Sequence, residues 1–309
     1  MRVIRDISHS KPLEGGCVAT IGNFDGVHLG HQMIINNLAK QGQKLGLPTV
    51  VVLFEPHPLE YFKGVEAPSR LTRMREKIAH LKTLPVDLIL LLRFGEKLAT
   101  LEPESFVHNY LVDRLALRLL VVGDDFRFGK QRRGNFKLLQ SLGTEYGFIV
   151  NDTATLLNDG QRISSTAIRQ ALEVGDLDQA RLLLGRPYSV CGRVVHGEGR
   201  GRQLGFPTAN IQLFRKKSPV RGVFAVTVVG ISEQPVPGVA NVGIRPTVGG
   251  DQRVILEVHL FDFNQDLYGK QVEIIFQQRI REERKFASFQ QLTEQIGKDA
   301  QQARQLLAV

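Results

Sequence analysis

The sequence contains no tryptophan and only two cysteines. Cys17 and Cys191 lie far apart along the chain, which excludes a disulfide framework and the short cysteine spacing of a zinc site. Both fall in strand-like segments. We therefore expect two small, buried hydrophobic side chains and no cysteine nucleophile.

Long hydrophobic runs are also absent. The longest, around Leu88–Leu92, is closed by Arg93 and is far shorter than the roughly 20 residues of a membrane-spanning helix. Arg5 and Asp6 interrupt the first ten residues, which excludes the apolar core of a secretory signal there. We expect a cytoplasmic protein that has no membrane partner.

Positive charge is in excess, with 40 Lys and Arg against 31 Asp and Glu. This balance favours nucleic-acid binding, because lysine and arginine neutralise phosphates. The basic residues are spread along the chain, however, with short clusters such as Gly129–Arg133 and Arg215–Lys217. Small polyanionic substrates also favour a positive surface, so we expect small-molecule substrates and no nucleic acid.

The length of 309 residues favours two domains. In the first part, apolar strand-like runs alternate with amphipathic segments, which predicts a Rossmann-like parallel sheet covered by helices. The expected strands are Cys17–Ile21, Thr49–Phe54, Leu88–Arg93 and Leu117–Gly123. The expected helices follow His28 and span Arg70–Leu84, Glu102–Leu115, Phe136–Tyr146 and Ser165–Leu172.

The pattern changes after Leu184, where Gly185-Arg186-Pro187 breaks the helical periodicity. We place a domain boundary there, giving domains 1–184 and 188–309. Beyond it, short strands alternate with glycine- and proline-containing turns, as in a small barrel or sandwich, and a final helix spans Ser288–Leu307. The expected strands are Tyr188–Val195, Gly222–Val229, Gly238–Val242, Val254–Phe261 and Gln271–Arg279.

A first candidate site follows the strand Cys17–Ile21. The loop Gly22-Asn23-Phe24-Asp25-Gly26 leads into a helix that begins near His28, the strand-loop-helix arrangement that binds phosphate. His28 and His31 are three residues apart, so both side chains face the loop and can donate hydrogen bonds to phosphate oxygens. The alternative is a glycine-rich turn whose histidines only cap and pack.

Two further segments have the composition of a nucleotide site. In Arg162-Ile163-Ser164-Ser165-Thr166-Ala167-Ile168-Arg169, hydroxyls and arginines gather at the start of a helix; an ordinary N-cap with solvated arginines is the alternative. The segment Val121–Gly129 is an apolar strand that ends in an acidic and aromatic turn, at the edge where α/β folds bind ligands.

Together with Pro56-His57-Pro58, these segments resemble the nucleotidyltransferase half of the prokaryotic bifunctional riboflavin kinase and FAD synthetase family. The resemblance implies that the loop and both histidines bind ATP phosphates. It also places Asp125 near the nucleotide or FMN, with Phe62 and Phe128 as weaker FMN-binding candidates. The implied ATP-binding residues are Gly22, Asn23, Phe24, Asp25, Gly26, His28, His31, Arg162, Ser164, Ser165, Thr166 and Arg169.

A second candidate site begins with the glycine-rich segment His196–Gly205, which is either a flap over phosphates or a surface loop. Phe206-Pro207-Thr208-Ala209-Asn210 follows directly. The Thr208 hydroxyl and the Asn210 amide oxygen are ligands suited to Mg²⁺ that keeps waters and phosphates as its other ligands. This segment therefore predicts a metal-nucleotide site.

The strand Val254–Phe261 carries a carboxylate among apolar residues. Period-two alternation puts Val254, Leu256, Val258 and Leu260 on one face and Ile255, Glu257, His259 and Phe261 on the other. Glu257 is either a glutamate on a half-exposed strand or a general base for a substrate hydroxyl.

The second half also resembles the same family, on the signatures GFPTAN, Asn241-Val242-Gly243 with Arg245-Pro246-Thr247, EVHLFDF before Asp266-Leu267-Tyr268-Gly269, and REERKFA. The resemblance implies a small antiparallel β-barrel with a C-terminal helix that partly closes an isoalloxazine pocket. It implies Thr208 and Asn210 on Mg-ATP and Glu257 as the base for the ribityl 5′-hydroxyl. The other implied ATP- or flavin-binding residues are Gly197, Gly199, Gly205, Pro207 and Arg281.

The resemblance implies a two-step enzyme that phosphorylates riboflavin to FMN and transfers AMP from a second ATP onto FMN. Its substrates are ATP, riboflavin and FMN, its cofactor is Mg²⁺, and we expect a monomer or weak homo-oligomer. An RNA-binding or RNA-modifying protein is the alternative, because HxGH-type loops also occur in aminoacyl-tRNA synthetases, but a lysine-rich KMSKS-like segment is absent. A flavin-binding regulator with degenerate sites is the third possibility.

Overall fold

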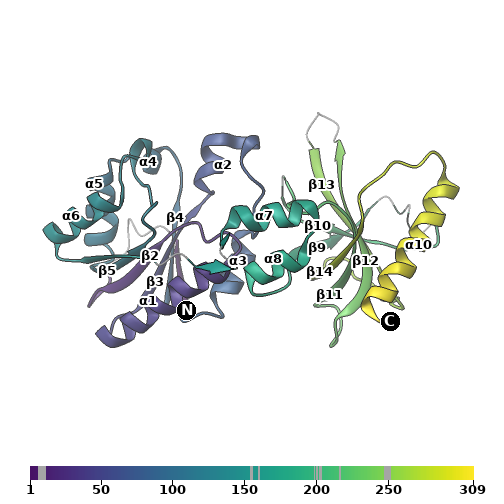
Figure 1. Cartoon of the computed structure of the whole chain (residues 1–309), viewed down its shortest axis with the longest axis horizontal. Coiled ribbons are helices and arrows are strands. Elements are labelled where there is room, and N and C mark those ends of the chain that lie inside the picture. The colour runs from purple at the N-terminus through teal and green to yellow at the C-terminus, as the bar shows by residue number, and fades with distance from the viewer. Residues whose placement is uncertain are drawn as a thin grey trace. The chain divides into compact units, whose positions relative to one another are not determined.

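The computed structural model describes residues 1–5, 12–153, 156–158, 161–197, 199, 201, 204–215, 217–246 and 252–309. The chain forms two compact units, one of Met1–Pro68 with Thr72–Ile163 and the other of Ser69–Leu71 with Ser164–Val309. Their secondary structure is shown in Figure 1. Within the described part of the chain, none of the helices combines the length and the apolar character needed to cross a membrane.

The first unit is built on a six-stranded parallel sheet with the order β1-β4-β3-β2-β5-β6. All five residues of β2 are buried, as expected for a parallel sheet with both faces covered. The strands are β1 (Arg2–Arg5), β2 (Cys17–Ile21), β3 (Thr49–Glu55), β4 (Leu88–Arg93), β5 (Leu117–Val122) and β6 (Ile149–Asp152).

Helices cover both faces of this sheet. Val50 and Val52 join the apolar cluster that contains residues of the π-helical turn η3 and of α6, whereas Val51 and Leu53 pack with α1 and α3. The helices are α1 (Leu29–Leu45), α2 (Pro58–Lys63), α3 (Met74–Leu81), α4 (Glu96–Ala99), α5 (Pro103–Phe106) and α6 (Phe136–Tyr146), with the shorter turns η2 (Gly64–Glu66), η3 (Val107–Val112) and η4 (Lys130–Arg132). A two-stranded hairpin, β7 (Leu157–Asn158) and β8 (Gln161–Arg162), precedes the second unit.

The second unit contains a closed antiparallel barrel with the strand order β10-β13-β12-β11-β14-β9. The structure therefore decides between barrel and sandwich in favour of the barrel. Helices α7 (Ser165–Val174) and α8 (Leu177–Leu184) precede it, and α10 (Phe289–Leu307) follows it (Figure 1). The strands are β9 (Ser189–Val195), β10 (Ala209–Gln212), β11 (Gly222–Val229), β12 (Val236–Pro246), β13 (Gln252–Leu260) and β14 (Gln271–Arg281).

Helices α7 and α8 belong to the same compact unit as the barrel, although the sequence assigns them to the first domain. Arg279 of β14 makes part of this connection, because its Nη1 donates a hydrogen bond to the carbonyl oxygen of Val174 at 3.0 Å. Gly175 packs against the same arginine so closely that an added Cβ would contact its side chain. The end of α7 is thus attached to the barrel.

Two local expectations from the sequence are wrong. The helix expected over Arg70–Leu84 begins only at Met74, because the backbone and hydroxyl of Thr72 are hydrogen-bonded to Asp25. Cys17 is fully buried, and burial raises the pKa of its thiol to about 12. Cys191 is only half-buried, so the expectation of burial holds for Cys17 alone.

Candidate active sites

The loop that follows β2 lies at the topological switch point of the parallel sheet, where the order of the strands changes direction. Strand β2 pairs with β3 on one side and with β5 on the other, so chain connections leave it in both directions. In open α/β sheets, ligands bind at the carboxyl ends of the strands at this point. The loops after β2 and β5, which contain two of the predicted segments, are therefore placed at the same edge.

The loop after β2 has a strained backbone. Phe24, Gly26 and Val27 have positive φ angles of 46°, 84° and 43°. Such angles are rare for a β-branched residue like Val27, and a strained residue of this kind costs on the order of 1–3 kcal/mol. The side chains of Phe24 and Val27 are 3 % and 1 % exposed. Their burial fixes the loop in a conformation that an isolated turn would not hold.

Polar contacts from a distant segment complete this fixation. The Oδ1 atom of Asp25 accepts hydrogen bonds from the backbone N–H of Thr72 at 3.0 Å and from its hydroxyl at 3.3 Å. The Thr72 Oγ1 atom accepts in turn from the N–H of Gly26 at 2.9 Å, and Lys77 Nζ donates to the carbonyl oxygen of Asn23 at 2.5 Å. Asp25 is therefore a buried support of the loop.

His28 and His31 face each other at the start of α1. Their rings are stacked with centroids 3.5 Å apart and an interplanar angle of 18°. His28 is the N-cap of α1, and its Nδ1 accepts a long hydrogen bond of 3.4 Å from the N–H of His31. An accepting Nδ1 places the proton of a neutral imidazole on Nε2, where it can be donated to a phosphate oxygen. His28 therefore caps helix α1 through Nδ1, and the predicted contact with phosphate would be made through Nε2.

His31 is held neutral by its surroundings. Its Nδ1 is buried and has no hydrogen-bond partner among the described residues. Burial lowers the pKa of His31 well below its ordinary value of 6.5, and electrostatic interactions with His28 and Lys77 lower it further. A neutral imidazole can donate one hydrogen bond through its protonated ring nitrogen and accept one through the other.

This depressed pKa predicts acid sensitivity of the first unit. Below about pH 6.5 the unfolded chain protonates His31 while the folded chain does not, so the free energy of unfolding falls as pH decreases toward the folded-state pKa. One histidine contributes at most about 1.4 kcal/mol per pH unit. Calorimetric unfolding from about pH 7.5 down to about pH 5 measures the slope. The slope should be shallower in His31→Gln than in the wild type, and equal slopes in the two proteins would contradict the expectation.

An ion pair joins two of the predicted segments in the first unit. Arg162 Nη2 lies 3.2 Å from Asp125 Oδ2, and both side chains are more than half exposed. Exposed pairs contribute little to stability, typically about 0–1 kcal/mol. The pair lies after β5, at the edge where open α/β sheets bind ligands, so both residues remain candidates for substrate binding.

The aromatic candidates differ in exposure. Phe62 on α2 is 62 % exposed and packs edge-on against Tyr61 and Phe94, with centroid distances of 5.2 and 5.7 Å. Phe128 is only 6 % exposed and lies under Phe126, whose ring stacks on it at 5.7 Å. A planar ligand can reach Phe62 directly. Tyr61 and Phe94 lie outside the predicted segments, whereas Phe126 belongs to the aromatic turn of Val121–Gly129.

In the Arg162–Arg169 segment, residues Ser164–Arg169 belong to the second unit, whereas Arg162 and Ile163 belong to the first. Ser164 is the N-cap of α7, and its Oγ accepts a hydrogen bond from the N–H of Ala167 at 3.2 Å. Arg169 Nε donates to the carbonyl oxygen of Ser69 at 2.6 Å. The N-cap interpretation thus holds for Ser164, while Ser165 and Thr166 form the first turn of the helix.

The second candidate site is organised by one row of residues that runs around the barrel. Asn210 of β10 is paired with Glu257 of β13, and Glu257 is paired with Asn241 of β12. The row continues through Val223 of β11 to Arg281 of β14. Directly opposed residues on antiparallel strands have Cβ atoms about 4.5–5.5 Å apart. Strand pairing therefore brings together Asn210, Asn241, Glu257 and Arg281, which come from four separate motifs.

This row forms the floor of a pocket of about 280 Å³. Leu256 and Val258, on the opposite face of β13, are 0 % and 1 % exposed, so Glu257 points away from the barrel interior. Helix α10 supplies the facing wall. The lining residues are Gly199, Gly201, Leu204, Phe206, Thr208, Asn210, Val223, Val239, Ala240, Asn241, Glu257, His259, Arg281, Glu283, Arg284, Phe286, Leu292, Ile296 and Asp299.

The other predicted residues of the barrel lie next to the pocket. The carbonyl oxygen of Pro207 accepts a hydrogen bond from His259 Nδ1 at 2.8 Å, and Gly205 has a positive φ of 82°. The motif residues Glu198, Arg200, Arg202, Gln203 and Thr247 lie outside the described residues. His259, Glu283, Phe286 and Asp299 were not anticipated as site residues, because their approach to Glu257 depends on strand pairing and on helix α10.

Gly197 supports Asn210. A Cβ at position 197 would overlap the Asn210 side-chain amide. Gly197→Ala should therefore displace that amide, and a misplacement of about 1 Å can lower a rate on the order of 100-fold. The measurement is the rate of the riboflavin phosphorylation that the sequence resemblance implies. Gly199→Ala is the matched control, because nothing lies within 4 Å of its added Cβ and alanine therefore meets no steric overlap there. The positive φ of 72° at Gly199 disfavours alanine by itself. An equal loss of rate in both variants would refute the steric role of Gly197.

Charge in the pocket is mixed. Burial raises the pKa of Glu283, and the nearby guanidinium groups of Arg221 and Arg281 partly oppose this rise. Among the described residues, no group of three His, Cys, Asp or Glu side chains could hold a metal ion by itself. The oxygens of Thr208, Asn210 and Glu257 nevertheless converge on one pocket, which suits a Mg²⁺ ion that keeps waters and nucleotide phosphates as ligands.

The fold and the two sites define a class of protein, a two-unit enzyme that transfers phosphoryl or nucleotidyl groups. The FAD synthetase family model matches residues 10–167, and the riboflavin kinase family model matches residues 184–307. The chain is 49 % identical over 310 residues to the bifunctional riboflavin kinase/FMN adenylyltransferase of Escherichia coli K12, covering 100 % of this chain and 99 % of that protein. It is 48 % identical to the Haemophilus influenzae protein of the same name, with 98 % of each covered.

A solved structure shares the whole architecture. The crystal structure named as a macrolide-efflux protein from Streptococcus pneumoniae superposes with a TM-score of 0.83 at 32 % identity, covering 98 % of both chains. Together with the two family matches, the full-length identity to the named enzymes is decisive. The chain belongs to the bifunctional riboflavin kinase/FMN adenylyltransferase family, as the sequence motifs predicted.

Proposed function

We propose that this chain makes FAD from riboflavin in two ATP-dependent steps at two separate sites. Residues 188–309 phosphorylate riboflavin to FMN, and residues 1–184 transfer AMP from ATP to FMN with release of pyrophosphate. The observation that carries this proposal is that one chain matches both families along nearly its whole length. Each step is a displacement at phosphorus that needs no enzyme nucleophile, in agreement with site residues that bind and position.

In the kinase step, Glu257 takes the proton from the 5′-hydroxyl of the ribityl chain. The hydroxyl oxygen then attacks the γ-phosphorus of ATP, and ADP leaves. Glu257 is paired with Asn210 on one side and with Asn241 on the other, so the position of its backbone is fixed by both neighbouring strands. Thr208 and Asn210 would hold Mg²⁺, which neutralises phosphate charge when it is bound.

In the adenylyl-transfer step, an oxygen of the FMN phosphate attacks the α-phosphorus of ATP. His28 donates a hydrogen bond from Nε2 to the phosphate oxygens as negative charge builds, and His31 lies stacked behind it. Asp125 and Arg162 orient the substrates, and the exposed ring of Phe62 receives the flavin. The resemblance also assigns Ser164, Ser165, Thr166 and Arg169 to ATP binding, and this assignment stays a prediction. Neither step requires a second copy of the chain, in keeping with a monomer or weak homo-oligomer.

The experiment that tests this function supplies the purified protein with riboflavin and ATP, with and without Mg²⁺, and separates the flavins by chromatography. FMN should form first and FAD later, and both should depend on the metal. If neither flavin forms while the protein shifts RNA in a gel with a steep salt dependence, the RNA-binding alternative is correct instead. Tight flavin binding without turnover would support the regulator.

A further inference from the structure

Arg281 is the one cation in the row of residues that forms the floor of the kinase pocket. It is the last residue of β14, where the chain leaves the barrel. The segment that follows, residues 282–287, contains no regular secondary structure before α10, and residues 282–285 are exposed. Glu283, Arg284 and Phe286 of this segment line the pocket. A segment with so little backbone support depends on side-chain contacts for its position.

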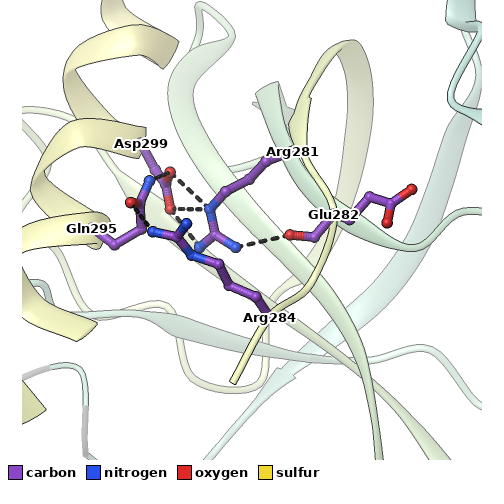
Figure 2. Close-up of polar contacts among 5 residues, drawn as sticks. All are labelled: Arg281, Glu282, Arg284, Gln295 and Asp299. Atoms are coloured by element: carbon purple, nitrogen blue, oxygen red, sulfur yellow. Dashed lines mark hydrogen bonds and ion pairs between the residues drawn. The ribbon is translucent and has the colours of Figure 1, made fainter. Parts of the chain in front are cut away.

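Those contacts come from one face of α10. Asp299 is only 3 % exposed, and its carboxylate accepts from Arg281 Nε at 2.9 Å and from Arg281 Nη2 at 2.7 Å. The remaining terminal nitrogen of Arg281, Nη1, donates to the carbonyl oxygen of Glu282 at 2.9 Å. This two-point pairing fixes the plane of the guanidinium as well as its position (Figure 2). A carboxylate this deeply buried would be unstable without its partner.

Gln295, one helical turn before Asp299, connects the Arg281–Asp299 pair to Arg284. Its Nε2 donates to Asp299 Oδ1 at 2.7 Å, and its Oε1 accepts a short hydrogen bond from Arg284 (Figure 2). The guanidinium carbons of Arg281 and Arg284 lie 5.6 and 4.9 Å from the centre of the Phe286 ring. Helix α10 thus holds both arginines, and the arginines hold the aromatic ring in the pocket wall.

We propose that Asp299 is a positioning residue of the riboflavin kinase site, which acts through Arg281 to hold the segment from Arg281 to Phe286 as the wall that receives the flavin ring. This inference rests on the proposed kinase activity of the barrel. The wall combines an aromatic ring and guanidinium groups with the apolar side chains of Val239 and Ile296. That chemistry fits a planar heterocycle with carbonyl acceptors, whereas the oxygens of Thr208 and Asn210 suit a Mg²⁺ ion bound with the phosphates of ATP.

The test is the steady-state kinetics of FMN formation by Asp299→Asn. The riboflavin KM should rise roughly 10- to 100-fold, the range found when a residue that orients a functional side chain is removed. The KM for ATP should stay within about twofold, because Asp299 acts on the flavin wall only. Adenylyl transfer from supplied FMN should be unchanged. Gln295→Leu should raise the riboflavin KM in the same direction by a smaller factor, and it provides the same readout if Asp299→Asn does not fold.

The matched control is Asp262→Asn. Asp262 forms an ion pair with Arg304 of α10, in which Arg304 Nη1 lies 2.8 Å from Asp262 Oδ2. Neither residue lines the pocket, and the Asp262 side chain is 80 % exposed. This variant weakens the attachment of α10 without touching Arg281, so its riboflavin KM should equal that of the wild type. A folded Asp299→Asn protein with an unchanged riboflavin KM, or with an equal rise in both KM values, would overturn the proposal. If the wild-type chain itself forms no FMN, the proposed function fails instead.

Discussion

Replacing Glu257 by glutamine should lower FMN formation from riboflavin by about 10²- to 10⁴-fold, the usual contribution of a general base. Glutamine keeps the size and shape of the side chain but cannot take the proton of the ribityl 5′-hydroxyl. Its neighbours Asn210 and Asn241 remain paired with the same strand. FAD formation from supplied FMN and ATP should be unchanged. Both rates are measured by chromatographic separation of the flavins.

The Glu257→Gln result separates a base from a structural glutamate. A half-exposed glutamate without a catalytic role would leave the rate of FMN formation within about twofold of the wild type. Surface substitutions change the free energy of unfolding by about 0.5 kcal/mol or less, so the variant would stay folded. His259→Gln is a useful companion, since His259 lines the same pocket two residues further along β13. Its loss should be smaller, because its Nδ1 is already engaged with Pro207.

The second large effect is expected at the other site. His28→Ala should lower FAD formation from FMN by about 100- to 1000-fold, as found when one donor to developing negative charge is removed. FMN formation from riboflavin should be spared. Because His28 also caps α1, alanine removes two functions at once.

His28→Asn separates the two functions of this residue. Asparagine is a good N-cap but has no imidazole, so it should restore the thermal stability that alanine loses without restoring AMP transfer. Recovery of FAD formation in His28→Asn would show that His28 acts only through the helix cap. AMP transfer would then not depend on a hydrogen bond from the His28 imidazole to phosphate.

Much of the fold could be predicted from local patterns. The strands Cys17–Ile21 and Leu88–Arg93 were predicted to the residue, because continuous apolar runs bounded by turn residues are typical of buried parallel strands. The helix over Phe136–Tyr146 was also predicted, and its end is marked by Gly147 in the left-handed region. The edge strands β1 and β6 were missed, because each has only four residues and only two of the four are apolar, too short a run to indicate a strand.

The sites were predictable only in part. Motifs identified Asn210, Glu257 and Arg281 one by one, yet the register that puts them in one row is set by strand pairing and cannot be read from any one segment. Asp299 gave no signal, because a single aspartate on an amphipathic helix is ordinarily solvated. The support that Thr72 gives to the loop after β2 was missed because Thr72 and Asp25 lie far apart in the sequence.

The claim that one chain carries two independent sites is tested most directly by mixing two inactive variants. Glu257→Gln and His28→Ala should each fail to convert riboflavin into FAD when assayed alone with ATP and Mg²⁺. Mixed in equal amounts, they should form FAD after a lag during which free FMN accumulates, because each protein supplies the step that the other lacks. Absence of FAD in the mixture, or loss of both half-reactions in either folded variant, would contradict the existence of two separable sites.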